Sequence, residues 1–167
     1  MSFFDTVLAT VQTEFAGTFD PEPLTRVVLR LSVALLLGAA IGWDRERRAP
    51  AGLRTHMLVA LGSSLLILVP TQSGMSEESV SRVIQGVMSG IGFLGAGAVL
   101  KDTSEGRIHG LTTAASIWAT AAVGITAGLG HESTAIMATG FVLLVLAVLR
   151  RLTRPRHNGF TDEHPAQ

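Results

Sequence analysis

Five long apolar stretches constrain this sequence more than any other feature. Each contains 16 to 20 residues and few charges: 24–43, 53–70, 83–100, 111–129 and 134–149. At 1.5 Å per residue the shortest would form a helix of about 24 Å, slightly less than the roughly 30 Å hydrocarbon core of a bilayer. Arg150 and Arg151, which follow that stretch, are expected to reach the headgroups. A soluble protein would have to hide five such helices behind short polar connections, so we predict an all-α bundle of five transmembrane helices.

The overall composition agrees with a single membrane domain. Hydrophobic residues make up 47% of the chain, the mean hydropathy is +0.43, and 18 of the 167 residues are glycine. The net charge is zero, which gives no reason to expect a nucleic-acid partner. The chain has no cysteine, so disulfides and thiolate metal sites are excluded.

Residues 1–23 precede the first span and have an amphipathic pattern. Apolar residues recur there at helical spacing: Phe3, Phe4, Val7, Leu8, Val11 and Phe15. A basic n-region and a long apolar run are both missing, so this is not a signal peptide. We expect a helix lying along the membrane interface or, alternatively, one docked on the bundle. Residues 24–149 then form the transmembrane domain, and residues 150–167 a short polar tail that is expected to be disordered.

The basic residues in the connections fall on one side of the predicted membrane. They are Arg45, Arg47, Arg48 and Arg54 after the first span, Lys101 and Arg107 after the third, and Arg150, Arg151, Arg154 and Arg156 after the fifth. The opposite side carries acidic residues: Asp5, Glu14, Asp20, Glu22, Glu77, Glu78 and Glu132. By the positive-inside rule, the N-terminus is outside and the tail is cytoplasmic. No internal repeat is strong enough to indicate an inverted-repeat transporter.

The segment 85–97 is glycine-rich yet otherwise apolar, which is not typical of a loop. On a helix, Gly86, Gly90 and Gly97 share one side, and Gly92 and Gly95 lie on the other. Small residues let membrane helices approach closely. We therefore predict that this segment is a buried central helix. Within the first span, Gly38 and Gly42 form a Gly-x-x-x-Gly pair suited to packing against it.

A first chemical candidate lies where the first span ends and the second begins. Its residues are Asp44, Glu46, Arg47, Arg54 and His56. One interpretation is a solvated loop whose charges pair weakly. The other is that the carboxylates point back into the bundle, where arginine neutralises them or a cation or proton takes its place. We predict one inward-facing charged cluster at the cytoplasmic end, with Glu46 near Lys101 or Arg107.

A second candidate is the hydroxyl face of the fourth span. Thr113, Ser116 and Thr120 fall on one side of a helix together with Gly124 and Ala127. Such faces most often hold helices together by hydrogen bonds, and sometimes line a solute path. We favour packing.

Arg26 and Arg30 are unusual because they lie inside the first span, one turn apart. Arg26 can reach the interface. Arg30 is expected either to do the same or to pair with Glu77, Glu78 or Gln85 across the bundle.

Four motifs, in order, closely resemble the signature of the MgtC/SapB family. They are Asp-Arg-Glu-Arg at 44–47, Ala-Gly-Leu-Arg-Thr-His at 51–56, Gly-Ile-Gly-Phe-Leu-Gly-Ala-Gly at 90–97 and Gly-Leu-Thr-Thr-Ala-Ala-Ser-Ile-Trp at 110–118. The resemblance covers roughly 24–149. It implies a bacterial inner-membrane protein linked to adaptation to low magnesium, survival in host cells and control of membrane energetics. Many members carry a folded cytoplasmic domain after the last helix, where this chain has only 150–167, and Asp44 replaces the usual first glutamate of the charged motif.

Two functions from different classes follow from these observations. The first is a non-enzymatic regulatory membrane subunit that docks on itself or on an energy-transducing inner-membrane complex such as ATP synthase. The second is a small channel or transporter for a cation or proton, with Asp44 and Glu46 near its cytoplasmic mouth. The spans contain no acidic residue, which argues against a midplane cation site. No nucleophile-base pair or metal-ligand spacing indicates an enzyme, and no cofactor is expected.

Overall fold

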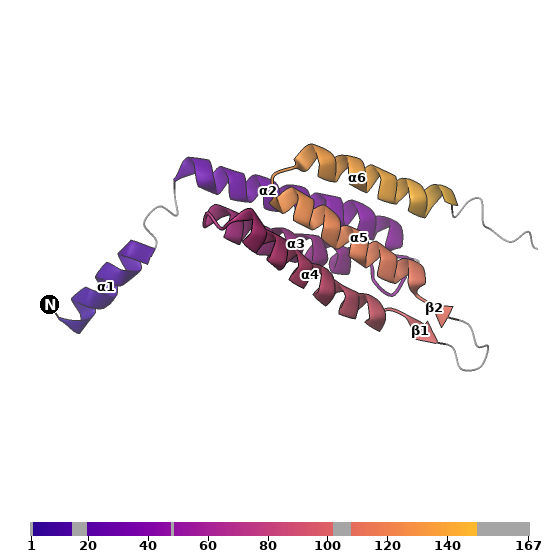
Figure 1. Ribbon diagram of the computed structural model, residues 1–167, viewed down its shortest axis with the longest axis horizontal. Helices are drawn as coiled ribbons and strands as arrows, with labels where there is room; N and C mark the ends of the chain where they lie inside the picture. Colours follow the sequence, from indigo (N-terminus) through magenta and orange to yellow (C-terminus); the bar gives the residue numbers. More distant parts are fainter. Residues whose placement is uncertain (1, 15–19, 48, 102–107, 150–167) are drawn as a thin grey trace, which may run out of the picture.

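The chain folds as a helical bundle, described by a computed structural model for residues 2–14, 20–47, 49–101 and 108–149 (Figure 1). In order, the elements are α1 (Phe3–Glu14), α2 (Pro21–Arg45), α3 (Leu53–Gln72), α4 (Glu77–Gly97), β1 (Leu100–Lys101), β2 (Ile108–His109), α5 (Leu111–Gly128), α6 (Glu132–Leu144) and the π-helical η1 (Val145–Leu149). The strands β1 and β2 pair antiparallel, with Leu100 opposite His109. The sequence predicts a plain connection here, so this short hairpin is an addition.

Successive helices of the bundle reverse direction. Figure 1 shows that the connection from α2 to α3, the hairpin and the end of η1 lie at one end, while the connections from α3 to α4 and from α5 to α6 lie toward the other. Segments that are far apart in the sequence therefore share the same end of the molecule.

Helix α5 is the centre of the bundle. It packs against α2, α3, α4 and α6, and ten of its 18 residues are buried. Glycine allows its closest contact, with α3: a Cβ atom on Gly128 would lie 2.6 Å from the carbonyl oxygen of Ser64, and one on Gly124 would lie 2.9 Å from Cα of Ala60. Both contacts are with backbone, which cannot move aside as a side chain can.

The Gly38 and Gly42 pair of α2 packs against α3. A Cβ atom on Gly38 would lie 2.7 Å from the carbonyl oxygen of His56, and one on Gly42 would lie 2.7 Å from Cα of Leu53. The prediction that this pair meets the glycine-rich segment is therefore wrong, because the first turns of α3 occupy the position.

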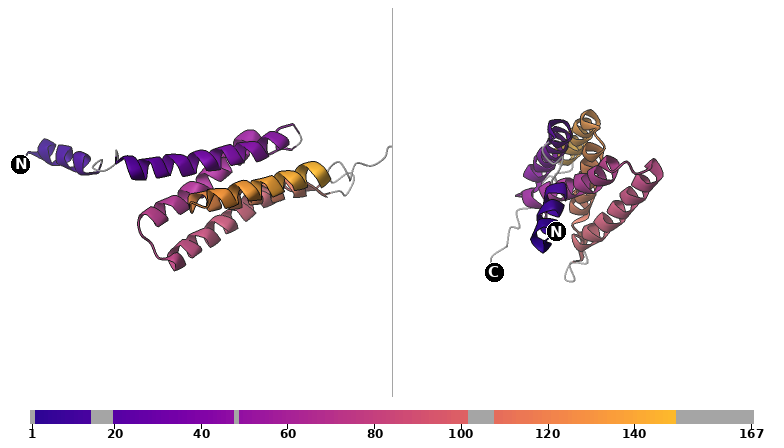
Figure 2. Two further views of the ribbon diagram at one scale, coloured as in Figure 1. Left: turned by 90° about the horizontal axis from the view of Figure 1, so that it is seen from above. Right: turned by 90° about the vertical axis from the view of Figure 1, so that its left-hand side faces the viewer.

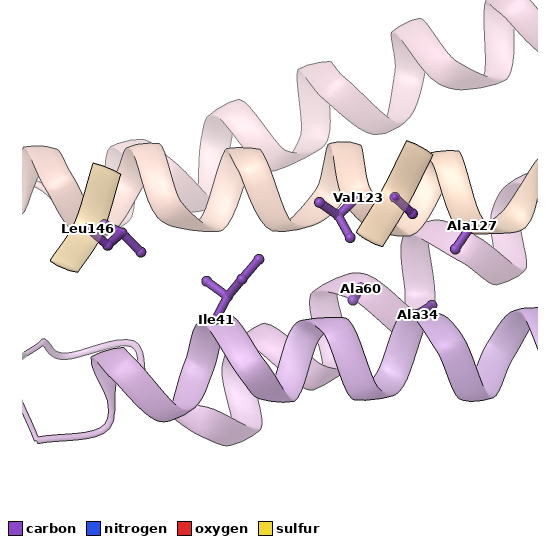
Figure 3. Packing of buried hydrophobic residues seen from close by; sticks show 7 residues of the cluster. Ala34, Ile41, Ala60, Val123, Ala127 and Leu146 are labelled. Atoms are coloured by element: carbon purple, nitrogen blue, oxygen red, sulfur yellow. The ribbon is translucent and has the colours of Figure 1, made fainter. Parts of the chain in front are cut away.

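Small side chains fill the space between α2, α3, α5 and α6. The cluster contains Ala34, Ile41, Ala60, Val123, Ala127, Ala135 and Leu146 (Figure 3). Four of these residues are alanine, so the helix axes lie close and leave little room between them. A second buried cluster, Ala51, Ile91, Ile117 and Ala121, joins α4 to α5.

The prediction that 85–97 is a buried central helix is wrong for the described chain. Helix α4 lies at the edge of the bundle (Figure 2) and packs mainly on α5. Apart from the helix's own backbone, no described atom lies within 4 Å of a Cβ atom added to any of four of its glycines: Gly86, Gly90, Gly92 and Gly97. Only Gly95 faces a neighbour, with Ala114 at 3.6 Å. Glycine permits close packing but does not require it, and the glycines of α2 and α5 form the close contacts instead.

Three helices of the described chain are long and apolar enough to cross a membrane: α2, α3 and α5. The apolar segment Glu132–Val148 is shorter, and α4 carries Glu77, Glu78 and Arg82 in its first two turns. The molecule is thus an all-helical membrane protein apart from its hairpin, but the five predicted spans are not confirmed.

Helix α1 stands apart from the bundle (Figure 2), and none of its residues is buried. Its apolar side chains are exposed, with Phe3 and Phe4 each 78% exposed and their rings edge to face at 5.9 Å. The alternative in which this helix docks on the bundle is therefore not what the structure shows. The predicted tail, 150–167, lies outside the described residues.

Candidate functional site

The candidate site lies at the end of the bundle where α2 ends and α3 and α5 begin. Residues of the Asp-Arg-Glu-Arg and Ala-Gly-Leu-Arg-Thr-His motifs meet there because α2 and α3 are antiparallel neighbours joined by a short connection. Polar side chains of the α5 hydroxyl face lie directly beneath them.

Glu46 caps the N-terminus of α3. Its carboxylate accepts a hydrogen bond from the backbone N–H of Leu53, the first residue of the helix. A negative charge at a helix N-terminus is favourable because the first N–H groups have no partner within the helix. Gly52 leaves room for this carboxylate, which a Cβ atom at that position would strike. A glycine is therefore needed at position 52, in the Ala-Gly-Leu-Arg motif, because the carboxylate of Glu46 from the other motif occupies the space of a side chain.

His56 is fully buried between α2, α3 and α5. Its Nδ1 atom lies 2.8 Å from the carbonyl oxygen of Gly52, and its Nε2 atom lies 3.2 Å from Oγ of Ser116. Gly42 allows this position, since a Cβ atom there would lie 3.1 Å from Cβ of His56. The imidazole therefore joins the first turn of α3 to α5.

The hydrogen atoms of this contact can be assigned from its acceptors. A carbonyl oxygen only accepts, so Nδ1 of His56 carries a hydrogen and donates to Gly52. The single hydroxyl hydrogen of Ser116 has two acceptors in reach, the Thr113 carbonyl oxygen at 2.8 Å and Nε2 of a neutral His56. A charged His56 would donate to Ser116 and leave the hydroxyl for Thr113. A neutral His56 therefore competes with the Thr113 carbonyl oxygen for the Ser116 hydrogen, whereas a charged His56 does not.

Arg45 lies in the predicted charged stretch but outside the predicted cluster, and the structure makes it a site residue. It is half-buried, and its Nη2 atom donates to Oγ1 of Thr113 at 3.3 Å. This bond joins the end of α2 to the start of α5. The only sequence signal was its place between Asp44 and Glu46, because Thr113 is 68 residues away.

A cavity of about 600 Å³ opens beside these residues. Its lining contains both charged and apolar residues: Ala40, Trp43, Asp44, Glu46, Arg47, Leu53 and Leu143. Asp44 is half-buried, whereas Trp43, Glu46 and Arg47 are exposed. Three residues of the predicted cluster, Asp44, Glu46 and Arg47, thus line one cavity. His56 is buried below the connection between α2 and α3.

Arg54 does not line this cavity, and its side chain is exposed on α3. A cluster that unites Asp44, Glu46 and Arg54 is therefore not what the structure shows. One helical turn of α3 places positions 54 and 56 on different faces, so only His56 points inward. The predicted neighbours of Glu46 cannot be compared, because Arg107 and the side chain of Lys101 lie outside the described part of the chain.

The predicted hydroxyl face of α5 is buried. Thr113 and Ser116 are each 3% exposed and Thr120 is 0% exposed. The Ser116 hydroxyl donates to the Thr113 carbonyl oxygen, and the Thr120 hydroxyl donates to the Ser116 carbonyl oxygen, each at 2.8 Å. Further along the same face, Gly124 meets Ala60 of α3. On this face the hydroxyl groups form hydrogen bonds within α5, and Gly124 allows α5 to pack closely against α3.

Arg30 lies at the opposite end of the bundle. Its Nη1 atom donates to the carbonyl oxygen of Gly128 at 3.0 Å, and its Nε atom lies 4.0 Å from Oε1 of Glu132. The predicted pairing with Glu77, Glu78 or Gln85 of α4 is wrong, and the alternative that Arg30 reaches the interface stays a prediction. The arginine instead caps the C-terminus of α5, where cations are favoured.

The described residues contain no group of three or more histidine, aspartate or glutamate side chains placed to hold a metal ion. The two carboxylates at the cavity, Asp44 and Glu46, come from one helix end and are accompanied by arginine. The structure therefore supplies a charged end with an adjoining cavity rather than a preformed metal centre.

Fold and site together define a class: a helical membrane protein with a charged motif at one end, fastened to a buried His-Ser contact. Residues 31–155 match the model of the MgtC family. The chain belongs to the MgtC family, which confirms the family that the motifs resemble. The match covers the helices from α2 to the end of the bundle.

Individual relatives are similar over most of this chain. Protein SrpB of Synechococcus elongatus is 45% identical over 137 residues, covering 75% of each protein. Protein MgtC of Brucella abortus is 41% identical, covering 80% of this chain and 55% of the relative; for Protein MgtC of Salmonella typhimurium the values are 41%, 74% and 52%. The chain thus spans about half the length of these MgtC proteins. No solved structure matches.

Proposed function

We propose that this chain is a non-enzymatic regulatory protein of the bacterial inner membrane, acting in adaptation to low magnesium and in control of membrane energetics. Membership of the MgtC family supports the class of function. The proposal includes five transmembrane helices, a cytoplasmic charged end, an outer N-terminus and α1 lying along the outer interface. Contact with an energy-transducing complex such as ATP synthase would take place at the charged end.

One observation carries the regulatory proposal. The charged motif lines a cavity at one end of the bundle, and an apolar core rich in alanine separates it from the other end. Glu46 and Arg45 bind atoms of α3 and α5, so they hold this end in shape. A shaped, charged end above a closely packed core suits recognition of a partner or an ion better than conduction through the bundle.

An enzymatic function has less support, although the site contains a histidine close to a serine. His56 is 0% exposed and Ser116 is 3% exposed, so neither can meet a substrate. The only hydroxyl hydrogen of Ser116 also has a carbonyl acceptor in the same helix. The contact therefore fits helix fastening rather than nucleophilic catalysis.

A second candidate function is transport of a proton or cation, favoured by one specific observation. Buried polar side chains lie along α3 and α5 from the charged end inward: His56, Ser116, Thr120 and Ser64. The Ser64 hydroxyl has no hydrogen-bond partner among the described atoms. Hydrogen-bonding groups in a row are what a proton path needs, so this line is the route to test.

The two functions predict different results for the same variants. In cells starved of magnesium, Asp44→Asn should abolish the effect of the protein on growth and membrane potential, whereas Arg54→Gln should keep it because Arg54 lies outside the cavity. Liposomes containing only the purified protein should show no proton or cation flux if the role is regulatory. Flux that falls in Ser116→Ala and Thr120→Val liposomes would instead establish transport. Wild-type growth and potential with Asp44→Asn would refute the role of the cavity.

A further inference from the structure

With α3 and α5 as membrane spans, α4 must cross the membrane as well, although its composition suits lipid poorly. Helices α3 and α5 are both long and apolar enough to span a membrane. Helix α4 connects the C-terminus of α3, at one end of the bundle, to the hairpin and the N-terminus of α5 at the opposite end (Figure 1). Its 21 residues give a length of about 31 Å at 1.5 Å per residue. The chain therefore places a helix within the bilayer that is not itself apolar enough to qualify as a span.

One stripe of the outward face of α4 is polar and small, and the exposed side chains of Phe93 and Leu94 lie beside it. Gln85, Ser89, Gly92 and Ala96 follow one another along it at helical spacing, and all four are exposed. Lipid offers no hydrogen bonds to an amide or to the backbone that glycine leaves uncovered. Small and hydrogen-bonding residues are what membrane helices use where they contact one another. The face is thus suited to another protein helix.

A projecting side chain and a groove lie side by side on this surface. Phe93 is 81% exposed, and beside it a groove of about 480 Å³ runs between α3 and α4, with Gly86, Gly90 and Gly62 among its lining residues. No described atom approaches within 4 Å of a Cβ atom on any of these glycines. A side chain in a helix points toward the helix N-terminus, so the ring at position 93 covers the level of position 90. The ring and the groove are therefore at the same height.

The start of α4 carries an ion pair of one acidic and one basic side chain, so the same segment of a second copy can offer opposite charges to both. Glu78 and Arg82 lie one turn apart on the exposed side, with Oε1 of Glu78 2.7 Å from Nη1 of Arg82. Two copies inserted in the same direction are related by a twofold axis along the membrane normal, so identical residues face each other at equal depth. Each Glu78 then faces Glu78 of the other copy, and both carboxylates have the two Arg82 side chains one helical turn, about 6 Å, away along the axis. No pair of like charges has to meet without an opposite charge next to it.

We propose that the occupant of this face is a second copy of the same chain, with two α4 helices in parallel and each Phe93 in the groove of the other copy. The contact follows from three independent features: a helix required to cross the membrane, an exposed ring level with a glycine groove, and a self-complementary charge pair. It rests on the membrane crossing of α4, which the proposed function includes, but it uses none of the residues at the charged end.

Cysteine cross-linking in membranes tests this arrangement, because the natural chain has no cysteine. Ser89→Cys should form a disulfide-linked dimer on mild oxidation. Leu36→Cys, on the exposed side of α2, is the matched control and should remain monomeric. Equal dimer yield from the two variants, or cross-linking of Ser89→Cys into species other than a dimer of this chain, would overturn the proposal.

Two further variants in the Ser89→Cys background test the groove. Gly90→Leu should fold normally, since open space surrounds the position in one chain, yet it should block entry of the other copy's ring. Phe93→Ala removes the ring itself. Both should lower the cross-linked fraction by at least about fivefold, as truncation of a central aromatic anchor does. Unchanged cross-linking by folded Gly90→Leu protein would refute the groove contact.

The charge pair allows a sharper test. Glu78→Arg alone places four arginines together in a dimer, and Arg82→Glu alone places four glutamates together, so each variant should dimerise poorly. When the two variants carry different tags and are expressed together, they should cross-link to each other at close to the parent yield. Recovery in this mixed dimer cannot arise from stability within one chain. Failure of the mixed pair to exceed either single variant would exclude the predicted charge contact.

Discussion

The close approach of α3 and α5 gives the most direct prediction. In Gly124→Ala, the new Cβ atom would lie 2.9 Å from Cα and 3.0 Å from C of Ala60, and would strike the Ala60 carbonyl oxygen. The carbon pair alone requires α3 and α5 to separate by roughly 0.6 Å to reach a normal contact of about 3.5 Å. A gap of that size removes about a quarter of the attraction between the atoms around it.

The expected loss in free energy of unfolding follows from these terms. Inserting a methyl group into a packed core costs about 1–3 kcal/mol, and the better helix propensity of alanine returns up to about 1 kcal/mol. We therefore expect Gly124→Ala to lower the free energy of unfolding by about 1–2 kcal/mol. Titration of the purified protein with SDS, followed by far-ultraviolet circular dichroism, measures this difference.

Gly140→Ala is the matched control. Gly140 is also helical, but it is exposed and has no described atom within 4 Å of an added Cβ atom. Alanine there should leave the free energy of unfolding unchanged or raise it by up to about 1 kcal/mol. If both variants unfold at the same SDS fraction, the close approach of α3 and α5 does not determine stability and the argument fails.

Three other predictions concern different parts of the chain. His56→Ala should lower the free energy of unfolding by about 2–5 kcal/mol, since it leaves a cavity and unpaired atoms, and Ser116→Ala should lower it by about 1 kcal/mol. Unfolding midpoints in SDS equal to that of the parent protein would contradict the buried contact. Arg30→Gln should lower the free energy of unfolding by about 1.5–3 kcal/mol, because the Gly128 carbonyl oxygen loses its charged donor. Glu132→Gln should lower it by less than about 1 kcal/mol, because the ion pair is long and partly exposed. A larger effect of Glu132→Gln in the same titration would show that the ion pair, and not the Gly128 contact, is the main role of Arg30. A maleimide that cannot cross membranes should label Ser76→Cys in intact cells and Pro50→Cys only after lysis, and labelling of both in intact cells would refute the proposed orientation.

Sequence patterns located most of the helices well because hydropathy marks the part of a helix that faces lipid or core. The second and fourth predicted spans, 53–70 and 111–129, differ from α3 and α5 by no more than two residues. The third, 83–100, begins six residues late, since α4 starts with polar turns that hydropathy ignores. Its start is set by Ser76, whose hydroxyl accepts from the N–H of Ser79. A capping residue followed by Glu77 and Glu78 is the signal that would have corrected this boundary.

The position of each helix in the bundle was harder to predict. Glycine spacing shows where a neighbour can approach, but it does not say which neighbour, so α4 was expected at the centre that α5 occupies. The candidate site was predicted in part for the same reason. Proximity along the chain brings Asp44, Glu46 and His56 together, whereas the contacts of Arg45 with Thr113 and of His56 with Ser116 span more than 50 residues and depend on the packing of α5.

The central place of α5 has a consequence for how the protein is made. Helix α5 is synthesised after α2, α3 and α4, yet it provides the surface on which α4 mainly packs. Until α5 enters the membrane, α2 and α3 can already form a hairpin through Gly38 and Gly42, while α4 has little of its final support. A nascent chain stopped before residue 111 should therefore hold two helices together and leave the third beside them in lipid, within reach of insertion factors and membrane proteases.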